Sequence, residues 1–140
     1  MTVRISWKWI LLAGLFAEAT VIALFFLLLL VATVAGFPEI ARPMSTLDYI
    51  DAMVSSFVTV FLFTLWAGKR IESAFVLHGA LIGVVGIVLF GIMWVSTTGS
   101  LAQPALYVVA HVLKVLGGIA GGLVAERRKR RVGSVERAHG

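Results

Sequence analysis

Four long apolar segments, separated by short polar stretches, make up most of this sequence. Between Lys8 and Glu39 the only charged residue is Glu18, so the pattern predicts a first helix over residues 9–35. A helix needs roughly 20 apolar residues to cross about 30 Å of hydrocarbon, and each segment is long enough. The remaining helices are predicted over about 46–67, 73–95 and 104–125, which gives a transmembrane domain, 1–126, and a basic tail, 127–140.

Capping and turn residues set the predicted boundaries. Ser45, followed three residues later by Asp48, is similar to a capping box at the start of the second helix. The stretch 74–113 carries no Asp, Glu, Lys or Arg and is too long for one span. We divide it at 97–100, where turn residues gather, and Pro104 then suits the first turn of the fourth helix.

The ends of the second and fourth helices are similar to each other. Residues 65–70 read LWAGKR, and residues 123–128 read LVAERR. Two parallel helical hairpins derived from a duplication would give this pattern, and so would chance among apolar residues. The predicted fold is therefore an all-α four-helix transmembrane bundle, and an arrangement as two parallel hairpins stays open.

Composition indicates that lipid is the solvent of this chain. Hydrophobic residues make up 60% and charged residues 14%, with a mean hydropathy of +1.02, whereas a soluble domain carries about a quarter charged residues. The absence of cysteine excludes disulfides, thiolate metal sites and a cysteine nucleophile. The net charge of +5 does not indicate nucleic-acid binding, because the basic residues crowd the ends of apolar segments.

Basic residues are concentrated at one set of helix ends. Two precede the first helix, two separate the second from the third, and six follow the fourth. By the positive-inside rule both termini face the cytoplasm, which predicts a multi-pass protein of the inner cell membrane. Aromatic residues agree, with Trp7, Trp9 and Trp66 at predicted inner ends and Tyr49, Trp94 and Tyr107 near outer ends. The basic residues expected at lipid headgroups are Lys69, Arg70, Arg127, Arg128, Lys129, Arg130 and Arg131.

Glycines recur at a spacing of three or four residues in the third and fourth predicted helices. Lipid offers no hydrophobic drive for helices to associate, so small residues that allow close backbone approach hold them together. Packing within the chain is one interpretation, and the interface of a homo-oligomer or of a larger membrane partner is the other. The predicted packing residues are Gly14, Gly79, Gly83, Gly86, Gly117, Gly118, Gly121 and Gly122.

Ionisable residues lie within the predicted spans, where each costs several kcal/mol unless it is paired or hydrated. The helical rise places Glu18 roughly 15 Å and Lys114 roughly 20 Å from the cytoplasmic ends of their helices. The candidate intramembrane polar residues are Glu18, His78, His111 and Lys114, together with a stripe of Asp51, Ser55 and Thr59 on the second helix.

Two pairings of these residues are open. Similar depths favour a salt bridge between Glu18 and Lys114. Side chains tilt toward the N-terminus of their own helix, however, and this tilt favours Glu18 with His78, and Lys114 with Asp51 or Ser55. On this basis we expect the second pairing.

Catalytic and cofactor motifs are missing from the sequence. It contains no Walker loop or dinucleotide fingerprint. The two intramembrane histidines are about 12 Å apart along the bundle axis, which is too far for both to ligate one haem iron. The predicted loops are too short for a soluble catalytic domain. We therefore expect no enzyme activity, no metal and no cofactor.

The layout of the chain resembles that of small bacterial membrane proteins of an uncharacterised four-helix family. Those proteins also carry a small-residue-plus-basic ending on the second helix, a glycine-spaced third helix and a KxLGGxxGG-like fourth, here KVLGGIAGG at 114–122. Glu18 and His111 are not features shared with that family. The resemblance implies a bacterial inner-membrane protein and no particular function.

Two hypotheses from different classes follow. In the first, the protein is a structural or accessory membrane module whose buried charges fix helix register. In the second, it is an oligomeric transporter or channel for protons, ions or a small solute that uses the cluster Glu18, His78, His111 and Lys114. The first is the preferred expectation, because a buried pair that only fixes register is a common arrangement.

Overall fold

Four helices form the whole of the described structure. The computed structural model describes residues 5–37 and 45–138, with side chains as far as Arg131, and no strand occurs among these residues. The helices are α1 (Trp7–Val34), α2 (Thr46–Gly68), α3 (Phe75–Thr98) and α4 (Ala105–Ala138). All four are long and apolar enough to cross a membrane. The predicted all-α bundle of four transmembrane helices is confirmed.

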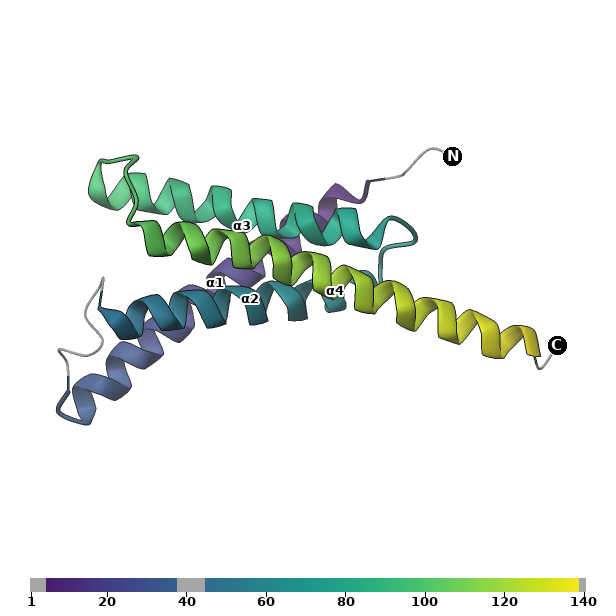
Figure 1. The fold of residues 1–140 in the computed structure, drawn as a ribbon, viewed down its shortest axis with the longest axis horizontal. Helices are drawn as coiled ribbons and strands as arrows, with labels where there is room; N and C mark the ends of the chain where they lie inside the picture. Colours follow the sequence, from purple (N-terminus) through teal and green to yellow (C-terminus); the bar gives the residue numbers. More distant parts are fainter. Residues whose placement is uncertain (1–4, 38–44, 139–140) are drawn as a thin grey trace.

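The helices are arranged so that α4 packs between α2 and α3, while α1 crosses the others obliquely (Figure 1). The start of α1, the connection between α2 and α3 and the end of α4 lie at one end of the molecule, called here the basic end. The end of α1, the start of α2 and the connection between α3 and α4 lie at the opposite, distal end. Toward the distal end α1 diverges from α3 and α4 (Figure 1).

Two boundaries differ from the predicted ones by three residues or more. The helix α3 continues to Thr98, and the hydroxyl groups of Ser96, Thr97 and Thr98 donate to carbonyl groups of the preceding turn. It ends only at Gly99, whose φ of 68° lies in the left-handed region. The helix α4 continues to Ala138, so the predicted basic tail is helical as far as it is described. Its Arg, Lys and Glu residues are strong helix formers.

Outward-facing side chains are large and apolar, whereas many inward-facing ones are small. On α1, Phe26, Leu30 and Val34 are 61%, 60% and 80% exposed. Buried positions instead include Ala13, Ala17, Ser55, Ser56 and Thr59. A soluble protein buries its large apolar side chains in preference to exposing them. The reverse arrangement found here fits lipid as the surrounding solvent.

Glycines bring α3 and α4 into backbone contact. A methyl group added to Gly79 would collide with the carbonyl group of Gly118, and one added to Gly118 would collide with that of Gly79. One turn further along α4, a methyl group on Gly122 would lie 2.5 Å from the carbonyl oxygen of Phe75. Only glycine permits backbones to approach this closely, so this face of α4 packs against α3.

The neighbouring glycines of α4, Gly117 and Gly121, pack against α2. A methyl group on Gly117 would lie 2.5 Å from the carbonyl oxygen of Phe57, and one on Gly121 would lie 2.8 Å from that of Phe61. The two overlapping GxxxG pairs of α4 therefore face two different helices. All eight predicted packing glycines contact another helix of this chain. An oligomer built through the same glycine faces stays a prediction.

Aromatic residues gather at both ends of the bundle. At the basic end the rings of Trp9 and Trp66 meet edge to face, with 5.6 Å between centroids, and the guanidinium group of Arg70 lies 5.5 Å from the Trp9 ring. At the distal end Trp94 and Tyr107 lie 5.5 Å apart. The predicted inner and outer aromatic residues thus lie at opposite ends of the molecule.

Candidate functional site

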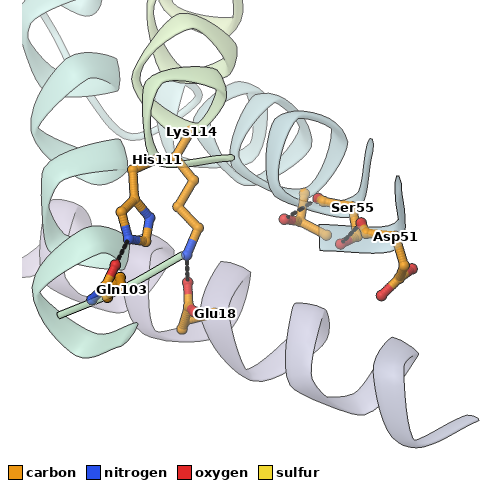
Figure 2. A network of polar contacts seen from close by, with 7 residues as sticks. Glu18, Asp51, Ser55, Gln103, His111 and Lys114 are labelled. Carbon is orange, nitrogen blue, oxygen red and sulfur yellow. Dashed lines mark hydrogen bonds and ion pairs between the residues drawn. The ribbon is translucent and has the colours of Figure 1, made fainter. Parts of the chain in front are cut away.

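Glu18 and Lys114 form an ion pair buried inside the bundle (Figure 2). The Nζ atom of Lys114 on α4 lies 2.6 Å from Oε2 of Glu18 on α1, and the two residues are 1% and 4% exposed. The ammonium group also lies 5.0 Å from the ring centroid of Phe90. Each charge offsets the cost of removing the other from water, so neither is stable there alone.

The pair joins two helices whose backbones do not approach each other within the described residues. Both α1 and α4 pack against α2 and α3, so the lysine side chain must cross the bundle to reach Glu18. Gly86 of α3 lies beside the pair, since a Cβ atom there would lie 3.6 Å from Cδ of Lys114 and 3.3 Å from Oε2 of Glu18. The prediction that Glu18 pairs with His78 is wrong, because the reach of a lysine side chain outweighs the tilt of the Cα–Cβ bonds.

His78 is instead a structural residue at the basic end. It is completely buried, and its Nε2 atom accepts a hydrogen bond of 3.0 Å from the backbone N–H of Ser6, which precedes α1. Its Nδ1 atom lies 2.9 Å from the carbonyl oxygen of Ala74. Since Nε2 accepts, Nδ1 carries the proton and donates to that carbonyl. His78 therefore fastens the start of α1 to the start of α3.

His111 lies nearer the distal end and contacts a different set of residues. Its Nε2 atom lies 2.8 Å from Oε1 of Gln103, as Figure 2 shows. Its ring meets Phe90 edge to face, with 5.1 Å between centroids. The Nδ1 atom is buried and has no hydrogen-bond partner among the described residues. His111 and Lys114 thus share Phe90 as a neighbour, but they do not hydrogen-bond to each other.

The polar stripe of α2 is bonded to its own helix. The hydroxyl group of Ser55 donates to the carbonyl oxygen of Asp51 at 2.5 Å, and that of Thr59 donates to the carbonyl oxygen of Ser55 at 2.6 Å. The carboxylate of Asp51 points away from Lys114 (Figure 2). The predicted contact of Lys114 with Asp51 or Ser55 is therefore wrong, since short hydroxyl side chains in a helix reach the carbonyl group one turn back.

A second buried carboxylate, Asp48, was not among the predicted polar sites. Asp48 is 6% exposed, and its Oδ2 atom accepts a hydrogen bond of 2.5 Å from the hydroxyl group of Tyr107. The predicted cap is present as well, because Ser45 accepts from the backbone N–H of Asp48 at 3.1 Å. The spacing of Ser45 and Asp48 indicated only the cap, and Tyr107 was assigned to the aromatic belt. The contact fastens the start of α2 to the start of α4.

A crevice of about 330 Å³ lies between α1 and the other three helices in the distal half of the bundle. Three carboxylate residues line it, Glu18 on α1 and Asp48 and Asp51 on α2. Its aromatic lining consists of Phe25, Phe26, Phe90, Trp94 and Tyr107. Pockets of this size, mostly apolar with a few polar groups, are the usual form of small-molecule sites. The crevice is therefore the candidate binding site of this molecule.

The basic end carries a separate set of charges. Lys69, Arg128 and Lys129 surround a shallow cavity of about 260 Å³ between α2 and α4. The Nζ atom of Lys129 donates to the carbonyl oxygen of Ile71 at 2.9 Å. The other predicted headgroup residues of α4 are exposed, namely Arg127, Arg130 and Arg131. Contact of these residues with lipid headgroups stays a prediction.

No group of three His, Cys, Asp or Glu residues in the described part of the chain could hold a metal ion. The expected absence of a metal, a cofactor and enzyme activity stays a prediction. Comparisons with known protein families, with curated proteins and with solved structures found no match to this chain. The resemblance to small bacterial four-helix proteins also stays a prediction, and functional conclusions rest on the geometry described above.

Proposed function

We propose that this chain is a structural or accessory module of the bacterial inner membrane, without enzyme activity of its own. The observation that carries the proposal is the Glu18–Lys114 pair, in which both residues are buried and 2.6 Å separates the charged atoms. A pair of this kind fixes the height of α1 relative to α4, because any other register would leave a buried charge unpaired.

The other intramembrane polar residues support the same proposal. His78 binds the backbone before α1, and His111 binds Gln103, so neither histidine hydrogen-bonds to Glu18 or Lys114 in the described structure. A proton path needs a continuous chain of exchangeable groups, whereas these residues lie in separate contacts.

The proposed orientation places the basic end in the cytoplasm. Lys69, Arg70 and the basic run 127–131 of α4 lie at this end of the molecule, and cytoplasmic ends of membrane proteins are enriched in such residues. A reporter enzyme fused after Gly140 would be active on the cytoplasmic side, and one inserted at Gly99 would be active on the outer side. The reverse result would overturn the orientation.

The structural role predicts a characteristic response to removal of the charges. Glu18→Gln or Lys114→Met alone would lower the free energy of unfolding by about 3–5 kcal/mol, because one buried charge is left without its partner. The double variant would recover most of that loss. Thermal unfolding in dodecyl maltoside measures this, and Glu126→Gln, which removes the exposed ion pair with Arg130, serves as the control. Equal losses in the single and double variants would contradict the proposal.

Transport by an oligomer is the second candidate, and the crevice favours it. The crevice has a volume of about 330 Å³ and extends to Glu18, which lies at a depth that a polar path across the membrane would have to pass. Proton or cation flux in proteoliposomes that disappears in the double variant, while that variant remains folded, would replace the structural proposal by transport. Stability changes without any flux would leave the structural role in place.

A further inference from the structure

The distal crevice has the lining of a site for an organic cation. Phe90, Trp94 and Tyr107 form a continuous aromatic cluster on one side, with Phe90 and Trp94 each 5.5 Å from Tyr107. Phe25 and Phe26 of α1 line the other side. Aromatic faces carry negative quadrupole charge and attract ammonium groups at distances within about 6 Å. The volume of about 330 Å³ would accept a single ring with a short side chain.

The charges around the crevice are mostly negative. Lys114 balances Glu18, and the Tyr107 hydroxyl group hydrogen-bonds to Asp48. Asp51 is half-buried beside them, and its carboxylate makes no hydrogen bond or ion pair with another described residue. A low-dielectric cleft lined by one sign of charge concentrates ions of the opposite sign.

Glu18 also offers an unfilled acceptor. Only its Oε2 atom binds Lys114, while Oε1 is buried and has no hydrogen-bond partner among the described residues. A buried carboxylate oxygen without a donor costs free energy, and an N–H group that reached it would remove that cost. Glu18 lines the crevice, so a donor bound there would lie beside this carboxylate.

We propose that the crevice binds a primary ammonium ion with an aromatic or similarly sized apolar body. The ammonium group donates to Oε1 of Glu18, the carboxylate of Asp51 attracts the cation, and the apolar body lies among the aromatic rings of α1 and α3. This site goes beyond the structural role proposed above and does not depend on it.

Isothermal titration calorimetry of the full chain in phosphatidylcholine nanodiscs tests the site, with 2-phenylethylammonium as the probe. The neutral analogue 2-phenylethanol has the same ring and a hydrogen-bond donor but no charge. We expect saturable binding of the cation and no displacement by the alcohol. Absence of saturable heat, or displacement by the alcohol at equal concentration, would overturn the proposal, and the second result would mean that the crevice accepts any small apolar molecule.

Two variants locate the binding. Asp51→Asn removes a charge that supports no contact in the described structure, so it should leave the fold intact and weaken binding about tenfold. The double variant Glu18→Gln with Lys114→Met should reduce affinity about a hundredfold. Glu126→Gln, at the basic end, should leave affinity unchanged. Unchanged affinity in Asp51→Asn would overturn the site. Stability and flux are separate readouts, so failure here leaves the structural role standing.

Discussion

The two halves of the bundle are held together in different ways. In the basic half, glycines place the backbone of α4 directly against those of α2 and α3, and His78 fastens α1 to α3. In the distal half, α1 diverges and polar side-chain contacts, such as that between Asp48 and Tyr107, connect the remaining helices. The basic half is held together by close backbone packing, and the distal half is held together by hydrogen bonds around the crevice.

The difference shows where a helix bundle in lipid can accommodate polar groups. Backbone contact between glycines leaves little volume for side chains between the helices of the basic half, and its cavity of about 260 Å³ is lined by basic residues and, among the described residues, by no carboxylate. The Glu18–Lys114 pair lies at the border between the two halves, because Gly83 still packs against the α4 backbone while Gly86 faces only side chains. The ion pair therefore marks the point at which close packing ends.

The largest expected effect comes from breaking the close-packed half. Gly118→Val would force α3 and α4 apart, because even a methyl group there collides with the carbonyl group of Gly79. We expect a loss of about 3 kcal/mol in the free energy of unfolding, measured by denaturation in mixed dodecyl maltoside and SDS micelles. Gly91→Val is the matched control, since nothing lies within 4 Å of its added Cβ atom. Equal losses in both variants would show that the contact does not hold the bundle.

A smaller loss of stability is expected when a hydrogen bond of the distal half is removed. Tyr107→Phe removes a buried hydrogen bond to the Asp48 carboxylate and should cost about 2 kcal/mol. Tyr49→Phe is the control, because its ring lies 5.2 Å from Tyr107 but its hydroxyl group bonds to no described residue. The same micelle denaturation measures both. If Tyr107→Phe were as stable as Tyr49→Phe, the hydrogen bond to Asp48 would not be what holds the distal half together.

The smallest effect concerns the junction of α1 with the basic half. His78→Leu removes the acceptor for the Ser6 N–H and should cost about 1 kcal/mol. Faster amide hydrogen exchange in the first turn of α1, with the rest of the bundle unchanged, would sharpen the comparison between the two halves. Uniformly faster exchange throughout the chain would instead show that His78 supports the entire core.

Helix number, helix packing and the polar positions could be predicted from the sequence because each depends on a local pattern. The apolar stretch 9–34, with Glu18 as its one charged residue, is long enough to form a span, and the GxxxG pairs of α4 require close neighbours. The pairing of charges could not be predicted. It depends on Lys114 reaching past Gly86 to a helix whose backbone does not approach that of α4, which is a property of three helices at once.

Other features were hidden for similar reasons. The last turn of α3 consists of Ser and Thr residues whose hydroxyl groups bond back to the helix, and such residues also favour turns, so Thr98 could be assigned either way. Asp48 has two roles, and its sequence spacing reveals only the cap. The crevice arises from the divergence of α1, and no residue pattern within α1 encodes the direction of that helix.

The oblique path of α1 has a consequence for the surrounding bilayer. At 1.5 Å per residue its 28 residues extend about 42 Å, while the hydrocarbon layer is about 30 Å thick. A helix with this hydrophobic mismatch takes up its surplus length by tilting, and a thicker bilayer draws it upright. Since the tilt of α1 separates it from α3, we expect a thicker bilayer to narrow the gap between them, so that lipid chain length would affect access to Glu18.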